Sequence, residues 1–307
     1  MTKVMVTGGA GFIGSNLVKH LLETGREVVI YDNLTSGYQK NVDALPDAVF
    51  VEGDVRDGNR LAEAMSGVDT VFHLAASVGN VRSIEAPIED SEVNVLGTLR
   101  VLEAARALKV RKVVFSSSAG IFGELKHLPI SEDHPVEPDS PYGASKLAAE
   151  KLCLAYAKLY EIEAVCLRYF NVYGPNQRYD AYVNVIPIFA HQMLLGQTVT
   201  IFGDGDQTRD FVNVRDVVRL NVLASEARGI SGAFNVGSGT AVTINRLVEL
   251  MSEAGGIKPH VQHGPPRKGD VRDSLADLSK SREAFGFEPQ VNLEDGHNEY
   301  MSWCKAD

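Results

Sequence analysis

The sequence predicts an α/β protein with a doubly wound parallel sheet and a smaller C-terminal lobe. Three observations predict it: apolar runs alternate with segments of helical periodicity, glycines follow the first run, and a carboxylate ends the second. The runs typical of buried strands are 3–7, 27–32, 48–52, 69–73, 112–116 and 163–168. The segments with apolar residues at helical spacing are 12–24, 57–66, 91–108 and 142–160.

The junction between the first strand and the first helix contains Gly8, Gly11 and Gly14. Glycine suits this turn because a Cβ atom would block either the tight bend or the approach of a pyrophosphate. The helix that follows offers free N–H groups and the positive end of its dipole to phosphates. The second strand ends in Asp32, about 20 residues further on, as in Rossmann-type folds. The turn therefore predicts dinucleotide binding.

Composition narrows the class of protein. The chain has 307 residues, of which 44% are hydrophobic and 23% charged, ordinary values for a globular protein. A formal charge of −10 argues against a general surface for nucleic acid or acidic membranes. Cys153, Cys166 and Cys304 are few and widely spaced, which suits a reducing compartment and gives no metal-ligand pattern. With no apolar run as long as a membrane span, we expect a cytoplasmic protein without a metal, nucleic-acid or membrane partner.

The regular alternation ends after Phe170, where prolines and glycines interrupt the pattern. We interpret residues 1–171 as the dinucleotide-binding domain and 172–307 mainly as a substrate-binding lobe. Residues 211–245 are expected to return to the first domain, with a short strand at 233–236. The lobe itself would consist largely of 172–210 and 255–276, above the carboxyl edge of the sheet.

A second group of polar residues surrounds the start of the helix predicted at 142–160. A proline at this start places Tyr142 and Lys146 at i and i+4 on one face. An ammonium group near a phenol lowers the pKa of the phenol, so Tyr142 becomes a candidate proton acceptor near neutral pH. Alone, such a pair is usually a surface feature. The nearby dinucleotide turn and the serines at 116–118, at the end of a strand, favour the catalytic interpretation.

With these motifs the chain strongly resembles the extended short-chain dehydrogenase/reductase family. Within it, the resemblance is to the NAD-dependent epimerases and dehydratases, and specifically to UDP-glucose (UDP-galactose) 4-epimerases. It covers essentially the whole length. The matching motifs are TGGAGFIG at 7–14, YDNLTSG at 31–37, GDV at 53–55, HLAA at 73–76, NVLGT at 94–98, SSSAGIFG at 116–123, SPYGASK at 140–146 and RYFNVYGP at 168–175.

The resemblance implies that the cofactor is NAD. Asp32 would accept the adenosine ribose hydroxyls and repel the extra phosphate of NADP, although it also fits a turn at a strand end. Asn94 would lie near the middle of the cofactor or cap a helix, and Tyr169 would lie near the nicotinamide or in the core. The other implied cofactor residues are Gly8, Gly11, Phe12, Ile13, Gly14, Asn33, Asp54, Val55, Leu74, Ala75, Ala76, Ser116, Tyr142 and Lys146.

The resemblance also implies a mechanism. Tyr142 would take the proton of the sugar 4-hydroxyl while Ser118 shares that hydrogen bond and a hydride moves from C4 to NAD. The 4-keto sugar would then turn over, and the hydride would return to the opposite face. Lys146 would bind the nicotinamide ribose and tune Tyr142. Ser118, Tyr142 and Lys146 are thus the predicted catalytic residues.

Several residues are predicted to bind a UDP-sugar. Guanidinium groups suit diphosphate oxygens because their donors form a planar fork, although a surface arginine is the usual alternative. By the same resemblance, Ser274 falls at a position where a small residue would leave room for an N-acetyl group, but it equally fits a solvated loop. The predicted substrate residues are Arg82, Ser83, Ser118, Asn171, Arg209, Arg267, Asp270 and Ser274.

The leading hypothesis is 4-epimerisation of UDP-glucose and UDP-galactose. Residues 119–123 contain no carboxylate, unlike the corresponding motif of related dehydratases and decarboxylases. Epimerisation of UDP-GlcNAc and UDP-GalNAc, epimerisation or decarboxylation of UDP-glucuronate, and a non-catalytic NAD(H)-binding sensor or scaffold are the alternatives. The resemblance implies a homodimer formed by the helices at 91–108 and 142–160. Their apolar residues Leu96, Leu99, Leu152 and Tyr156 equally fit a face directed at the sheet.

Overall fold

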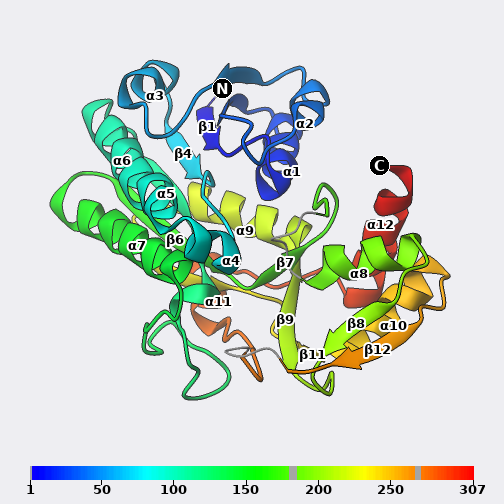
Figure 1. Ribbon diagram of the computed structural model, residues 1–307. Helices are drawn as coiled ribbons and strands as arrows, with labels where there is room; N and C mark the ends of the chain where they lie inside the picture. The colour runs from blue at the N-terminus through cyan, green and yellow to red at the C-terminus, as the bar shows by residue number, and fades with distance from the viewer. Residues whose placement is uncertain (1, 180–184, 267–270) are drawn as a thin grey trace.

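Seven parallel strands form the centre of the computed structural model, which describes residues 2–179, 185–266 and 271–307 (Figure 1). The strand order is β10-β6-β5-β4-β1-β2-β3, so the order reverses between β1 and β4. This confirms the predicted doubly wound sheet. The strands are β1 (Lys3–Thr7), β2 (Glu27–Asp32), β3 (Val49–Glu52), β4 (Thr70–His73), β5 (Lys112–Ser118), β6 (Glu163–Tyr169) and β10 (Gly232–Val236).

Helices cover both faces of this sheet, which explains why its strands are almost continuously apolar. In β1, Val4 and Val6 belong to the core on one face, whereas Met5 belongs to the core on the other. The first face is covered by α1 (Phe12–Glu23) and α9 (Val214–Glu226). The second is covered by α3 (Gly58–Ala64), α6 (Thr98–Ala107) and α7 (Pro141–Leu159).

The segment between β4 and α6 is more irregular than the sequence predicts. The helix expected at 91–108 begins as a π-helix, η1 (Glu92–Gly97), before it continues as α6. Two short helices, α4 (Asn80–Glu85) and α5 (Pro87–Ser91), precede it. A Cβ atom at Gly97 would lie 2.7 Å from Cγ2 of Val55, so this glycine lets η1 pack closely against the segment after β3. The remaining short helices are α2 (Gln39–Asp43), the 3₁₀ helix η2 (Ala119–Ile121) and α11 (Ser279–Phe285).

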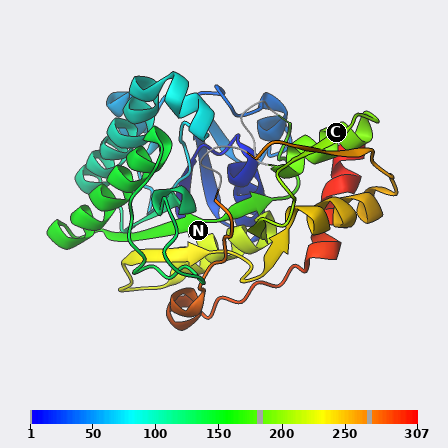
Figure 2. The same ribbon diagram turned by 60° about the horizontal axis from the view of Figure 1, so that its bottom comes forward.

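A separate apolar cluster lies in the C-terminal part, which Figures 1 and 2 show beside the large sheet. Its helices are α8 (Val185–Leu194), α10 (Ile244–Gly255) and α12 (Leu293–Ala306). Its strands form a three-stranded sheet of β7 (Asn171–Tyr173), β9 (Thr208–Asn213) and β11 (Ala241–Thr243), and a pair of β8 (Val199–Phe202) and β12 (Val261–Gly264). Within 211–245, α9 and β10 join the large sheet, while β9 and β11 do not. The domain boundaries stay a prediction.

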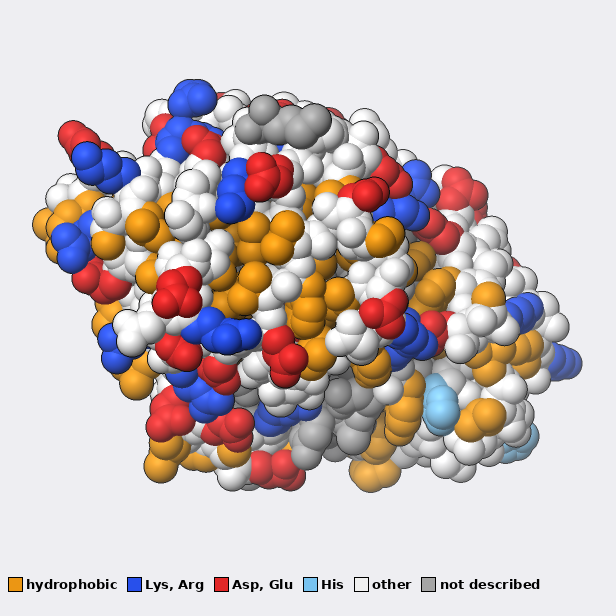
Figure 3. Space-filling view, turned by 90° about the horizontal axis from the view of Figure 1, so that it is seen from above, with side chains coloured by type: hydrophobic (Ala, Val, Ile, Leu, Met, Phe, Trp, Pro, Cys, Tyr) orange, Lys and Arg blue, Asp and Glu red, His pale blue; other side chains and the backbone are white. Residues whose placement is uncertain are grey.

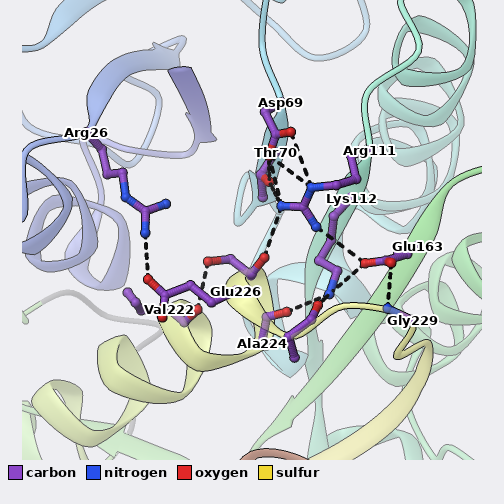
Figure 4. A network of polar contacts seen from close by, with 12 residues as sticks. Arg26, Asp69, Thr70, Arg111, Lys112, Glu163, Val222, Ala224, Glu226 and Gly229 are labelled. Atoms are coloured by element: carbon purple, nitrogen blue, oxygen red, sulfur yellow. Dashed lines mark hydrogen bonds and ion pairs between the residues drawn. The ribbon is translucent and has the colours of Figure 1, made fainter. Parts of the chain in front are cut away.

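A polar network fastens the amino ends of β5 and β6 to the end of α9 (Figure 4). Lys112 is fully buried, and its ammonium donates to the carbonyl of Ala224 at 2.9 Å and to that of Ala227. It also forms an ion pair with Glu163 at 2.9 Å. Carbonyls at a helix C-terminus lack intrahelical partners and carry the negative end of the dipole, so they suit a buried cation. Next to it, Arg111 pairs with Asp69 at 2.8 Å.

The surface carries both signs of charge. In the view of Figure 3, Lys and Arg alternate with Asp and Glu around a central area of hydrophobic side chains. No helix in the described ranges is both long enough and apolar enough to cross a bilayer.

Candidate active site

The glycine turn lies where the strand order reverses, which is where open α/β sheets bind ligands. Gly8 has φ of +72°, a conformation that favours glycine, and a Cβ atom there would lie 2.7 Å from the backbone nitrogen of Ala75. A Cβ atom at Gly14 would overlap the carbonyl oxygen of Gly8. These two glycines therefore let the turn, α1 and the loop after β4 pack against one another.

Gly11 has a more open environment: among the described residues, only the Gly8 carbonyl oxygen would lie near a Cβ atom there, at 3.2 Å. Gly11 is the N-cap of α1, so Phe12 and Ile13 form its first turn. First-turn N–H groups have no intrahelical acceptor, and with the helix dipole they form an anion site. A pyrophosphate fits this open turn, and an alanine at position 11 would narrow it.

Asp32 ends β2 and is 7% exposed. Its carboxylate accepts the N–H of Ala10 at 3.0 Å and that of Leu34 at 2.8 Å. Burial raises the pKa of Asp32, while these two hydrogen bonds act in the opposite direction. These two hydrogen bonds are the contacts expected of a residue that closes a turn at a strand end, which is the alternative interpretation of Asp32. Each oxygen also retains lone pairs for a ribose hydroxyl.

The residues predicted along the adenosine half gather beside Asp32. Asn33 donates to Asp54 at 2.9 Å, and Arg56 donates to both oxygens of the same carboxylate, at 2.9 and 2.7 Å. These bonds lower the pKa of Asp54 well below its usual range. Val55 is buried beneath them. Hydrogen bonds from Asn33 and Arg56 therefore hold the Asp54 carboxylate in place.

The loop at Leu74–Ala76 rests on a buried polar network that the sequence reasoning missed. His73 is fully buried and is hydrogen-bonded to Thr7 at 2.7 Å and to Thr98 at 2.9 Å. Burial lowers the pKa of His73 to about 3, and the nearby Lys146 acts in the same direction. A histidine at the end of an apolar strand was the signal in the sequence.

Asn94 holds the next residue of this loop. Its side chain accepts the N–H of Ser77 at 2.9 Å and donates to the Ser77 carbonyl at 3.0 Å. Asn94 lies inside η1, so the alternative that it caps a helix is wrong. Ser116, the remaining residue predicted for the middle of the cofactor, is buried in β5.

The three predicted catalytic residues come from β5 and the start of α7. Ser118 ends β5 and accepts the N–H of Gly120 at 3.1 Å. A Cβ atom at Gly120 would lie 3.3 Å from the Ser118 hydroxyl and 3.8 Å from Cε1 of Tyr142, so the two side chains are neighbours. Lys146 is 2% exposed, and its ammonium lies 4.3 Å from the centre of the Phe115 ring.

The pKa of Tyr142 in the folded chain differs from the sequence expectation. Burial raises the pKa of Tyr142 to about 12; the hydrogen bond from Ser118 lowers it, and the charge of Asp90 raises it further. Burial lowers the pKa of Lys146 to about 8. The expected lowering of the tyrosine pKa is therefore wrong for the protein alone, because burial of the phenol raises this pKa and the charge of Lys146 is not among its causes.

Tyr169 and Asn171 flank the carboxyl end of β6. Tyr169 pairs with Ser118 in the sheet, and its buried hydroxyl hydrogen-bonds to Asn221 on α9. Asn171 begins β7 and donates to the carbonyl of Asp210 at 3.2 Å. The side chain of Tyr169 is thus held in the core, which is one of the two positions that the sequence allowed for it.

The residues predicted to bind the substrate are spread over two regions. Arg82 and Ser83 lie on α4, and Ser83 is buried with its hydroxyl donating to the carbonyl of Asn80 at 2.8 Å. Arg209 lies on β9 and donates to the carbonyls of Thr208 at 2.8 Å and Arg272 at 3.4 Å. The predictions for Arg267 and Asp270 fall outside the described residues.

Ser274 is partly buried in the segment that crosses β9. This segment is held by Asp210, a fully buried carboxylate that the sequence reasoning missed. Asp210 accepts the N–H groups of Ser238 at 2.6 Å, Gly239 at 3.0 Å and Ala276 at 3.1 Å. In the part of the chain that the structure describes, no three His, Cys, Asp or Glu side chains are grouped as metal ligands.

Comparison with known proteins gives three findings. The model of the NAD-dependent epimerase/dehydratase family matches residues 4–237. A UDP-glucose 4-epimerase of Mycolicibacterium smegmatis is 42% identical over 96% of each chain. Two similar solved structures are a UDP-glucose 4-epimerase of Thermotoga maritima with UDP-glucose (39% identity, 99% of each chain, TM-score 0.95) and a UDP-N-acetylglucosamine 4-epimerase of Methanobrevibacter ruminantium with UDP-N-acetylmuramic acid (35% identity, 99% of this chain and 98% of that one, TM-score 0.95).

Proposed function

Since the chain belongs to the NAD-dependent epimerase/dehydratase family and is a UDP-sugar 4-epimerase, an isomerase that uses NAD, we propose that it interconverts UDP-glucose and UDP-galactose. The observation that carries the proposal is the neighbouring position of Ser118 and Tyr142 at the carboxyl edge of the sheet. The absence of a carboxylate at 119–123 supports simple oxidation and reduction at C4. The similar enzymes named UDP-glucose 4-epimerase support the choice of sugar.

In the proposed reaction, Tyr142 is the proton acceptor. Its phenolate takes the proton of the sugar 4-hydroxyl, and Ser118 stabilises the developing charge through the hydrogen bond that it shares. When bound, NAD supplies the acceptor and donor of a hydride and a positive charge that favours the phenolate. The 4-keto sugar turns while its nucleotide stays anchored, so that C4 would take the hydride back on its opposite face, and Tyr142 returns the proton to the oxygen on C4.

Lys146 binds the nicotinamide ribose in this scheme. Its buried ammonium lies over the ring of Phe115. Lys146 and Tyr142 both lie in the first two turns of α7, so the two residues are close to each other. Ammonium groups donate up to three hydrogen bonds, so Lys146 can hold a ribose hydroxyl and still favour the phenolate.

The cofactor is held by three parts of the carboxyl edge. The first turn of α1 binds the pyrophosphate, Asp32 binds the adenosine ribose, and the loop at 74–76 lies against the middle of the cofactor. This assignment is supported by the open position at Gly11 and by the buried carboxylate of Asp32. Asn33, Asp54 and Val55 line the adenosine half, and Asn94, Ser116 and Tyr169 support the nicotinamide half.

The nucleotide of the substrate is held by the lobe. We assign this role to Asn171, Arg209, Arg267 and Asp270, with Arg82 and Ser83 on the sugar side. A specific observation also favours the N-acetylated sugars as a second substrate pair. Ser274 has a small side chain, which would leave room for an N-acetyl group, and the neighbouring Asp273 is fixed by a hydrogen bond from Thr208 at 2.8 Å.

We also propose that the protein is a homodimer in which η1, α6 and α7 of two copies form a helical bundle. Leu96 on η1 is 54% exposed, and Leu159 at the end of α7 is 71% exposed. Removing such apolar side chains from water in an interface with a second copy is favourable and would stabilise the dimer.

The test is a substrate survey. Purified protein is incubated separately with UDP-glucose, UDP-GlcNAc and UDP-glucuronate, and the products are separated and identified by NMR. We expect UDP-galactose from UDP-glucose, with UDP-GalNAc formed more slowly. Loss of carbon dioxide, or no inversion at C4 of any sugar, would contradict the proposal. Tyr142→Phe is the matched control: it should bind NAD and lack turnover, whereas a non-catalytic NAD-binding protein would give no turnover in either form.

A further inference from the structure

Asp210 is a fully buried carboxylate on β9 that no step of the proposed reaction uses. Both of its oxygens accept hydrogen bonds. Oδ1 accepts from the N–H and the hydroxyl of Ser238, and Oδ2 accepts the N–H groups of Gly239 and Ala276. An NH₂ group in place of either oxygen would therefore lose at least one of these hydrogen bonds, because it can only donate.

The donors to Asp210 come from two segments that are remote from β9 in the sequence. Ser238 and Gly239 follow β10 of the large sheet, whereas Ala276 lies in the segment before α11. The three segments pack closely, since a Cβ atom at Gly237 would lie 2.7 Å from Oδ2 of Asp210 and 2.7 Å from Cβ of Ala276. Asp210 thus joins β9 both to the large sheet and to the segment before α11.

The segment before α11 is also held on both sides of Ser274. On one side, the N–H of Thr208 on β9 donates to the Arg272 carbonyl at 3.0 Å. On the other side, the N–H of Ile130 donates to the carbonyl of Leu275 at 2.7 Å. Ser274 therefore has a fixed position beside β9.

Three of the residues proposed to bind the substrate are arranged around Asp210. Arg209 precedes Asp210 on β9, so their side chains point to opposite faces of the strand. The Asn171 amide donates to the carbonyl of Asp210 at 3.2 Å, and Ser274 lies two residues before Ala276. The three residues belong to β7, β9 and the segment before α11, so their separation depends on how these segments are joined.

We propose that Asp210 is a positioning residue for the nucleotide of the substrate: its buried carboxylate sets the separation of Asn171, Arg209 and Ser274. This rests on the proposed function, in which those three residues touch the UDP-sugar. A guanidinium binds a diphosphate well when its planar fork faces the oxygens, so a displacement between these segments weakens binding. The catalytic residues lie on β5 and α7, whereas the donors to Asp210 lie after β10 and before α11. Loss of this junction should therefore weaken nucleotide binding and leave the chemical step intact.

The test is the binding of UDP to Asp210→Asn, which keeps the size of the side chain but replaces one acceptor with a donor. Isothermal titration calorimetry with UDP measures the affinity without turnover. We expect Kd of UDP and KM of UDP-glucose both to rise by about tenfold, since a displacement of about 1 Å can cost a factor of about 100. The value of kcat at saturating UDP-glucose and the amount of bound NAD should stay within about twofold of the wild type.

Asp216→Asn is the matched control. Asp216 is 2% exposed on α9 and accepts the N–H groups of Gln290 at 2.9 Å and Val291 at 3.0 Å. It joins α9 to the segment before α12, where no residue is assigned to the substrate. A purely structural role of Asp210 predicts that both variants lose stability and that neither changes Kd of UDP. A positioning role predicts a higher Kd in Asp210→Asn alone.

If Asp210→Asn does not fold, Gly237→Ala takes its place, because the added methyl group would separate the same segments and should raise Kd of UDP as well. An unchanged Kd in the folded variant, or an equal rise in Asp216→Asn, would overturn the inference. A wild-type protein that binds UDP but inverts C4 of no sugar would contradict the proposed function instead, which separates the two results.

Discussion

Gly143 contacts the carbonyl of Gly120 so closely that a Cβ atom at position 143 would overlap this oxygen. The same Cβ atom would lie 2.8 Å from Cβ of Pro138. The first turn of α7 therefore packs directly against the turn that follows Ser118, and this contact sets the separation of Ser118 and Tyr142.

Gly143→Ala tests this contact. The added methyl group should push the start of α7 away from the turn, and a displacement of about 1 Å at a reacting group can reduce the rate by about 100-fold. We expect kcat to fall by at least about tenfold with bound NAD retained. Steady-state kinetics and the absorbance of bound cofactor measure both quantities. Gly58→Ala, at the start of α3 beside the flexible side chain of Arg100, should leave kcat unchanged.

Lys112→Met tests the polar network at the opposite end of the sheet. The substitution leaves Glu163 and the carbonyls at the end of α9 without their buried cation, and such losses cost about 3–5 kcal/mol. The free energy of unfolding, measured in urea, should fall by this amount while kcat of the folded enzyme stays unchanged. Lys126→Met removes an exposed ion pair with Glu124 and should change stability by less than about 1 kcal/mol. Equal losses in the two variants would contradict the prediction.

His73 should make stability depend on pH. Its pKa falls from 6.5 to about 3 on folding, so between these values the unfolded chain binds more protons than the native protein. The contribution is fully present above pH 6.5 and is lost as pH falls toward 3, by up to about 1.4 kcal/mol per pH unit.

Denaturation in urea at a series of pH values measures this dependence. In His73→Asn the slope between pH 6.5 and pH 3 should be smaller, because asparagine keeps hydrogen-bonding groups but does not titrate in this range. The exposed His127→Asn serves as the control and should retain the wild-type slope. A slope in His73→Asn equal to that of the wild type would exclude His73 as its source.

The proposed dimer predicts the effect of charges on the helical bundle. Leu96→Glu combined with Leu159→Glu should give a monomer, because a carboxylate in an apolar interface is costly to remove from water. Light scattering after size-exclusion chromatography measures the mass. Leu195→Glu changes a leucine of similar exposure in the other lobe and should leave the mass unchanged. A wild-type protein that is already monomeric would rule out the proposed dimer.

The strands and the glycine turn were predictable because their causes are local. The central strands are buried on both faces, so most of their residues are apolar, and Gly8 adopts a backbone conformation that few other residues tolerate. The spacing of Tyr142 and Lys146 likewise follows from the helix that carries both.

The rest depends on contacts between distant segments. In the π-helical start of the helix at 91–108, Gly97 packs against Val55, and His73 is held by Thr7, 66 residues away. The pKa of Tyr142 was predicted with the wrong sign because the sequence reveals its charged neighbour but not its burial.

The buried ammonium at the foot of β5 has an evolutionary consequence. This ammonium holds the amino ends of β5 and β6 to α9, so that attachment does not depend on the rim that is proposed to meet the sugar. Loops on that rim can therefore exchange residues and accept new sugars while the scaffold beneath them persists.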